Sequence, residues 1–198
     1  MDLASTSTII SFFLGIGLAA SAGFRVFVPL FALSLAAHFG LNILSLNEGW
    51  QWIGSWPAII TLGVATIVEV LAYYIPVVDN LLDSIAVPVA TIAGTLLMGA
   101  TLADMSEVAT WALAIIAGGG VAATVSGTTA ATRAVSTGTT AGTGNFLVNT
   151  GETFIASILS ITSFIWAPLA FILVILSLIG IYFLWKKSKR WFSGTPSR

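Results

Sequence analysis

Two arginines lie inside apolar segments, where a charged side chain usually has a structural or chemical task. Arg25 belongs to the run "AASAGFRVFVPLF", and Arg133 belongs to the small-residue run "TAATRAVS". A guanidinium keeps its proton in proteins, so in hydrocarbon it needs a carboxylate, water or an anionic ligand beside it. Each arginine therefore has two interpretations: a structural ion pair, or contact with an anionic substrate.

Small and hydroxyl-bearing residues near both arginines would complete an anion site. If the first run breaks at Gly23, Arg25 falls in the first turn of a new helix, where free N–H groups favour anions. Near Arg133, hydroxyls could hold an ion or a phosphate head group. The alternative is that the small residues pack helices closely and the hydroxyls bond to backbone carbonyls. The predicted substrate-binding residues are Arg25, Arg133, Gly23, Thr128, Thr129, Thr132 and Ser136.

Four acids are the natural counterparts of these arginines. Glu69 and Glu152 lie inside apolar segments, where a carboxyl is kept either by pairing or by protonation. Asp79 and Asp83 follow Pro76 at a spacing of four residues, which is typical of a helix start but also fits an entry site for cations. The predicted coupling or gating residues are Glu69, Glu152, Asp79 and Asp83.

Several classes of site are missing from the sequence. It has no cysteine and a single histidine, His38, which leaves no ligand set for zinc or haem. It has no serine–histidine–aspartate pattern and no phosphate-binding loop. We therefore expect no enzyme activity, no cofactor, no metal site and no nucleic-acid partner.

Composition indicates a membrane protein. Of its 198 residues, 57% are hydrophobic and 8% are charged, whereas soluble domains carry roughly 25% charged residues. We expect a multi-pass protein of the cell (inner) membrane. Basic residues gather at the end of the chain, which predicts a cytoplasmic C-terminus; they are Lys186, Lys187, Lys189, Arg190 and Arg198.

Apolar runs predict the helices that position these residues. Residues 7–39 are too long for one crossing and short for two, so we expect a break there. Further spans are predicted at 57–75, 84–103, 146–164 and 166–185, with a second long run at 108–135 broken by the glycines at 118–120. Residues 75–83 are predicted to form a polar turn.

The order of these features occurs twice. Each half has a long run with one arginine, then a span with one glutamate, then a span beginning at a proline, here Pro88 and Pro168. This predicts one transmembrane domain, 1–198, with repeat one at 5–103, repeat two at 106–190 and a basic tail at 186–198. The expected fold is an all-α integral membrane protein with two weakly related repeats. Each repeat would have a broken or re-entrant helical hairpin followed by two transmembrane helices. Parallel and inverted repeats both fit.

Three stretches resemble a known family. They are "GLAASAGFRVFVPLFALSLAAHFG", "WIGSWPAIITLGVATIVEVLAYYIPVVDNLLDSI" and "AATRAVSTGTTAGTGN". Together they are similar to the bacterial and plastid membrane family called domain of unknown function 4126. The resemblance implies an integral membrane fold without an assigned activity. A looser architectural analogy is to DedA-type membrane proteins, which combine re-entrant hairpins with arginines and acids and are linked to lipid-phosphate transport. The positions that recur in the family correspond here to Gly23, Arg25, Glu69, Pro76, Asp79, Asp83 and Arg133.

These features predict a small transporter or flippase for an anionic solute or a lipid phosphate, with a midplane site between two broken helices. One alternative is a proton-coupled or cation channel or carrier that uses the buried carboxylates. Another is a membrane scaffold that transports nothing. The expected partners are the lipid bilayer, an anionic small molecule or lipid head group, and a second copy of the chain.

Overall fold

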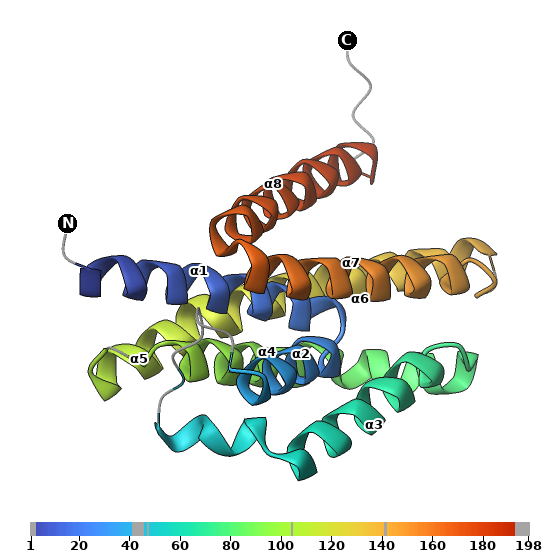
Figure 1. Ribbon diagram of the computed structural model, residues 1–198. Helices are drawn as coiled ribbons and strands as arrows, with labels where there is room; N and C mark the ends of the chain where they lie inside the picture. The colour runs from blue at the N-terminus through green and yellow to red at the C-terminus, as the bar shows by residue number, and fades with distance from the viewer. Residues whose placement is uncertain (1–2, 41–45, 47, 104, 141, 193–198) are drawn as a thin grey trace.

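The computed structural model describes residues 3–40, 46, 48–103, 105–140 and 142–192. Within these ranges the protein is helical and has no strand (Figure 1). The elements are α1 (Leu3–Phe24), α2 (Phe27–His38), the 3-10 helix η1 (Glu48–Gly54), α3 (Trp56–Ala72), α4 (Pro76–Thr101), α5 (Glu107–Leu113), the π-helical η2 (Ala114–Gly119), α6 (Gly120–Thr140), α7 (Asn145–Ile165) and α8 (Ala167–Phe192).

The helices have the length and surface of a membrane protein, which confirms the predicted class. Among the described residues, three helical stretches are long and apolar enough to cross a bilayer: Thr6–Phe24, Val77–Thr101 and Glu107–Thr140. Shorter apolar helices include Trp56–Ala72 and Ala167–Gly180. One face of α3 exposes an apolar stripe at helical spacing, made of Ile60, Val64, Ile67, Val68 and Leu71.

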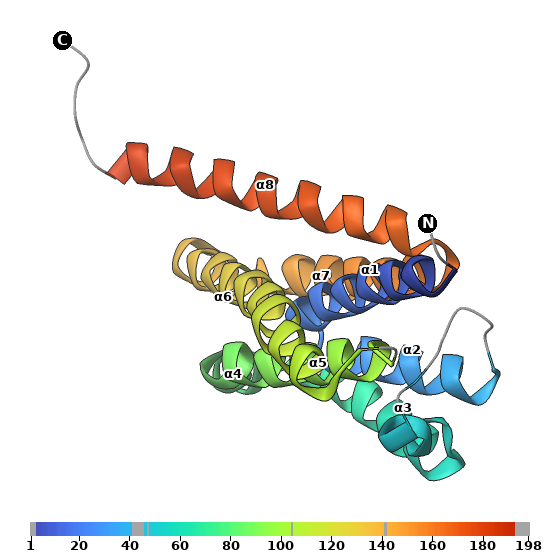
Figure 2. The same cartoon turned by 90° about the vertical axis from the view of Figure 1, so that its left-hand side faces the viewer.

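Helix α1 lies at the centre of the molecule and packs against α4, α6, α7 and α8. Its core positions are Leu14 and Leu18, which pack with Leu33 and Leu97 from other helices. Helix α8 rests on this bundle and carries the chain away from it (Figure 2). The side chains of the predicted basic cluster at Lys186, Lys187, Lys189 and Arg190, and all of Arg198, lie outside the described part.

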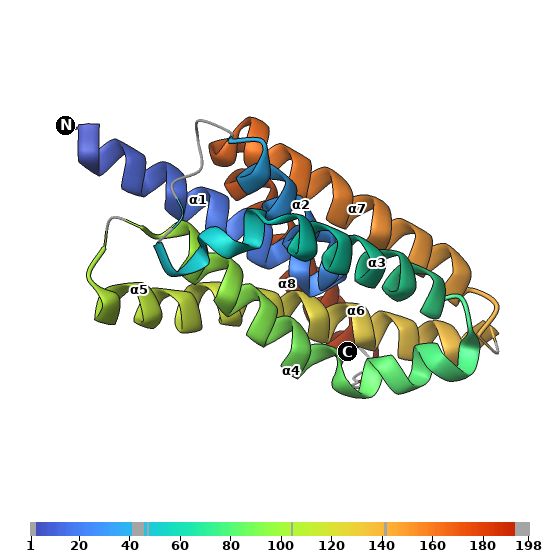
Figure 3. The same cartoon turned by 60° about the horizontal axis from the view of Figure 1, so that its bottom comes forward.

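The first long run breaks as predicted, two residues beyond the expected glycine. Helix α1 ends at Phe24, and α2 begins at Phe27 and runs back beside it (Figures 1 and 3). Pro29 falls in the first turn of α2, where a missing N–H costs nothing. Gly23 itself stays helical: a Cβ there would lie 2.5 Å from Val125 Cβ, so glycine allows α1 and α6 to pack closely. The segment from α1 to α2 is therefore a helical hairpin with its tip at Arg25 and Val26.

The predicted break in the second long run is wrong. The chain is helical from Glu107 to Thr140, and the glycines at 118–120 fall at the end of η2 and the start of α6. A Cβ on Gly118 would lie 2.6 Å from the carbonyl oxygen of Gly94 on α4. The glycine serves close packing of two helices and does not interrupt one. Arg25 thus lies at a helix break, whereas Arg133 lies on a continuous helix.

Most of the polar turn predicted at 75–83 is also helical, since only Ile75 lies outside α4. Pro76 begins α4, and Asp79 lies in its first turn. The fixed φ of proline suits this first position, and an acid there offsets the helix dipole. Pro88, which was expected to begin a span, lies inside α4.

Candidate functional site

Arg25 and Arg133 meet at one carboxylate. The Nη1 atom of Arg25 lies 3.1 Å from Glu152 Oε2, and Nη1 of Arg133 forms an ion pair with the same oxygen. Each arginine is only 1% exposed. The hairpin tip, α6 and α7 are therefore joined by a buried ion-pair network, which is the arrangement that lets an arginine persist in apolar surroundings.

Residues of α7 and α1 supply the remaining hydrogen-bond acceptors of Arg25. Its Nε donates to Thr153 Oγ1 at 3.0 Å, and Nη2 donates to the carbonyl oxygen of Asn149 at 3.0 Å. Nη1 also donates to the carbonyl oxygen of Phe24 at 3.3 Å. Every nitrogen of this guanidinium therefore has a protein acceptor. Arg25 fits the structural interpretation better than direct contact with a substrate.

Arg133 pairs across the bundle with α4. Its Nε donates to Asp83 Oδ1 at 2.7 Å. The ring of Tyr73 lies beside both arginines, with its centroid 3.9 Å from Cζ of Arg25 and 5.0 Å from Cζ of Arg133. An aromatic face attracts a cation by about 0.5–2 kcal/mol, so Tyr73 adds to the stability of the pair.

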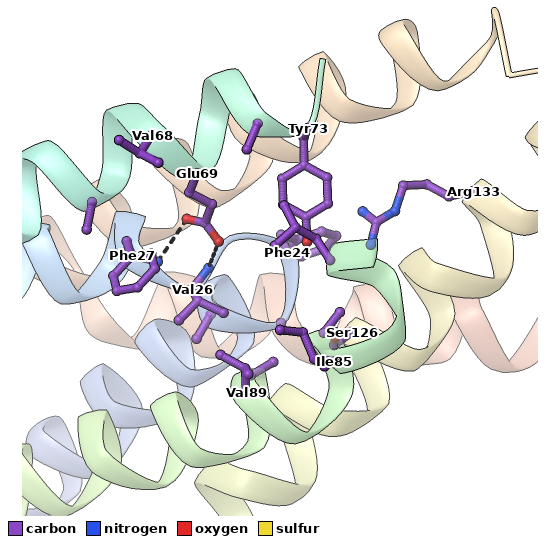
Figure 4. A pocket seen from close by; sticks show the side chains of 17 residues that line it. Phe24, Val26, Phe27, Val68, Glu69, Tyr73, Ile85, Val89, Ser126 and Arg133 are labelled. Carbon is purple, nitrogen blue, oxygen red and sulfur yellow. Dashed lines mark hydrogen bonds between the residues drawn. The ribbon is translucent and has the colours of Figure 1, made fainter. Parts of the chain in front are cut away.

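Glu69 does not pair directly with an arginine. Its two carboxylate oxygens accept hydrogen bonds from the backbone N–H groups of Val26 and Phe27, at 2.7 and 2.9 Å (Figure 4). These are free donors at the start of α2, where negative charge is also favoured by the helix dipole. Glu69 thereby attaches α3 to the tip of the hairpin.

Asp79 is buried, 2% exposed, at the far end of α4 from α5. Its Oδ2 accepts from Nδ2 of Asn145 at 2.9 Å. Three buried oxygens among the described residues have no hydrogen-bond partner: Asp79 Oδ1, Asn145 Oδ1 and Glu152 Oε1. The unpartnered buried side-chain atoms among the described residues are thus all acceptors.

The structure brings together only some of the predicted site residues. Arg25, Arg133, Asp83 and Glu152 form one cluster, with Glu69 at the same hairpin tip. The predicted threonines bond to their own helix: Thr128 donates to the carbonyl oxygen of Thr124, Thr129 to that of Ser126, and Thr132 to that of Thr128. Ser136 lies near the end of α6, where its carbonyl oxygen accepts from Thr140. These bonds fit the alternative interpretation, in which the hydroxyls bond to backbone carbonyls and the small residues allow close helix packing.

Sequence reasoning identified Glu152 but missed the other polar residues on the same face of α7 and the aromatic ring beside the arginines. Asn145, Asn149, Glu152 and Thr153 fall at positions i, i+4, i+7 and i+8, so they share one face of a helix. That spacing was visible in "NFLVNTGETF". Tyr73 gave no comparable signal, because a tyrosine at a helix end is usually an interfacial residue.

A cavity of about 440 Å³ adjoins this cluster. It lies between the hairpin tip, α3, α4 and α6, and its walls are mostly apolar side chains such as Phe27, Val68 and Val89 (Figure 4). Glu69, Tyr73, Ser126 and Arg133 are its polar lining residues. Helices α3 and α4 diverge from the short turn that joins them (Figure 1), and residues of both line the cavity.

The fold and this site define an α-helical membrane protein with a network of buried charges at the tip of a helical hairpin. The chain belongs to the family described as Domain of unknown function (DUF4126), whose model matches residues 12–187. The match contains every residue of the network. No curated protein and no solved structure was found to match the chain.

Proposed function

We propose that this protein is a small transporter or flippase for an amphipathic anion, such as a lipid phosphate, that binds in the 440 Å³ cavity. The observation that carries the proposal is the composition of the cavity wall: it is apolar, and a buried arginine is part of it. An acyl chain suits the apolar wall, and a phosphate suits the fork of a guanidinium. The protein would act in the inner membrane as a multi-pass carrier with its C-terminus in the cytoplasm.

Arg133 is the arginine that can bind a ligand in this scheme, because it lines the cavity and Arg25 does not. Its partner Asp83 has a side chain that is 19% exposed, whereas that of Glu152 is 6% exposed. An anionic head group would therefore replace Asp83, while Glu152 and Arg25 hold the guanidinium in place. Asp83 would return when the ligand leaves.

The hairpin supplies the moving part of the proposed carrier. Its tip is short non-helical backbone inside the bundle, which membrane proteins accept only where protein or a cavity surrounds it. Glu69 holds this tip against α3, so release of that contact would open the cavity on one side. In this scheme the hairpin is re-entrant and Glu69 is the gating residue.

Two adjacent residues of α3 give a matched test. Val68 and Ile67 are similarly exposed, 59% and 61%, but only Val68 lines the cavity. In proteoliposomes containing a fluorescent phospholipid, Val68→Trp should slow lipid movement between leaflets strongly, and Ile67→Trp should leave it unchanged. Arg133→Gln should also abolish movement, with the exposed Thr132→Val as its control. Equal rates for Val68→Trp and wild type, with both proteins folded by gel filtration, would exclude this cavity.

A second candidate is a proton-coupled or cation carrier, favoured by the excess of acids over arginines. Four carboxyls, those of Glu69, Asp79, Asp83 and Glu152, lie with two guanidiniums in the described core. In that case Glu69→Gln should reduce ion flux more than Arg25→Gln does. A membrane scaffold that transports nothing would instead show no ion or lipid flux. Charge-neutral variants of its buried acids and arginines would then lose only stability.

A further inference from the structure

A second, smaller cavity lies beyond the ion-pair network, where two helix turns meet. It measures about 200 Å³ and is lined by residues of the α3–α4 turn, including Tyr74, and of the α6–α7 turn, including Gly142 and Thr143. Asp79 and Asn145 also line it. Both turns follow the C-terminal ends of helices, whose last carbonyl groups carry partial negative charge.

Two residues that line this cavity, Asp79 and Asn145, each have a buried side-chain oxygen without a partner. Asp79 Oδ1 and Asn145 Oδ1 have no hydrogen-bond partner, and their residues are 2% and 7% exposed. The orientation of the amide follows from its neighbour: a carboxylate only accepts, so Asn145 must present Nδ2 to Asp79 Oδ2. The amide oxygen is therefore left as an acceptor, and a buried acceptor without a donor is costly.

Further lone pairs are available beside these two oxygens. The Thr143 hydroxyl donates its proton to the carbonyl oxygen of Thr140 at 2.9 Å, which leaves its own oxygen able to coordinate. No lysine or arginine lines the cavity. Oxygen ligands with one carboxylate fit a hard cation, and a single negative charge is balanced by a single positive one.

We propose that Asp79 and Asn145 form a binding site for a monovalent alkali cation such as Na⁺, with the Thr143 hydroxyl as a further ligand. The cation would be coordinated by two otherwise unpartnered oxygens and would link the α3–α4 turn to the α6–α7 turn. An anion does not fit, because the unpartnered side-chain atoms of Asp79 and Asn145 are both acceptors. This site is separate from the apolar cavity, so it does not depend on the proposed transport function.

The test is the thermal stability of the full-length protein in detergent, measured in NaCl, KCl and choline chloride at equal ionic strength. The midpoint of unfolding should rise in a saturable way with Na⁺ or K⁺ and stay constant with choline. Asp79→Asn should weaken the apparent cation affinity by about tenfold or more. Glu107→Gln changes an exposed acid at the start of α5, a helix that follows the opposite end of α4 from Asp79 (Figure 1), and should leave the affinity unchanged.

Two further variants keep the test decisive if Asp79→Asn does not fold. Thr143→Val changes an exposed turn residue and should weaken cation affinity without loss of folded protein. Asn145→Asp adds a second carboxylate and should shift the preference from Na⁺ towards Ca²⁺. Equal stabilisation of the wild type by choline, or stabilisation of the wild type by Ca²⁺ alone, would overturn the monovalent site.

Discussion

Glu152 is the residue on which the buried charges converge. One of its oxygens receives both arginines, so neither Arg25 nor Arg133 has an independent environment. The sequence identified both arginines and all four acids, because charge inside an apolar run is conspicuous. It did not identify which acid pairs with which arginine, since that depends on how α7 packs against the hairpin tip. Glu69 is closer in sequence to Arg25 than Glu152 is, yet its carboxylate accepts hydrogen bonds from the backbone N–H groups of Val26 and Phe27.

The role of Glu69 at the start of α2 gives a prediction at the scale of one residue. Glu69→Gln keeps one acceptor oxygen but cannot accept from both Val26 and Phe27, so the first turn of α2 should open more often. Loss of such a cap costs about 1 kcal/mol. Hydrogen–deuterium exchange should therefore become roughly fivefold faster at the amides of Val26 and Phe27. Amides in the middle of α7 provide the internal control, and unchanged exchange at the two tip amides would contradict the assignment.

At the scale of elements, the structural effect of glycine was the hardest feature to predict from the sequence. A run of three glycines in an apolar segment indicates a break, but it equally permits another helix to approach. Gly118 illustrates the second case, because its partner is the backbone of Gly94. The choice between the two depends on a neighbour that is distant in sequence. Spans without such ambiguity, such as 146–164, agree with the helices within a few residues.

Two neighbouring glycines provide a matched pair of variants. Gly118→Ala would place a Cβ against Gly94 and Met98, so we expect a loss of about 1–3 kcal/mol as α4 is forced away. Gly120→Ala meets nothing within 4 Å and should be neutral or stabilising by up to about 1 kcal/mol, because alanine favours helix. The difference is measured by thermal unfolding in detergent. Equal midpoints for the two variants would show that close approach of α4 to η2 does not need glycine.

At the scale of the whole molecule, two of the three ion pairs among the described residues join the two halves of the chain, and the third, Arg133 with Glu152, lies within the second half. Arg25 of the first half pairs with Glu152 of the second, and Arg133 of the second half pairs with Asp83 of the first. The predicted internal repeat stays a prediction, but this crossed pairing shows why the halves pack as one unit. Sequence order alone could not predict it, since Arg25 is closer in sequence to Glu69 than to Glu152, and Arg133 is closer to Glu152 than to Asp83.

A double-mutant cycle tests the contact between the halves. Arg133→Gln alone leaves Asp83 without its partner, and Asp83→Asn alone leaves part of Arg133 unpaired. The double variant should therefore be less destabilised than the sum of the two, by about 0.5–3 kcal/mol. The combination of Arg133→Gln with the remote Glu107→Gln should be additive. Additivity within the first pair, measured by unfolding in detergent, would argue against a direct ion pair.

The dependence of the hairpin tip on α7 also imposes an order on biosynthesis. Arg25 leaves the ribosome long before Asn149, Glu152 and Thr153, which later supply its acceptors. Until those residues emerge, Arg25 lacks the acceptors that it has in the folded protein, so the hairpin tip cannot reach its final environment before α7 is made. The first helices to be made are thus among the last to reach their mature environment.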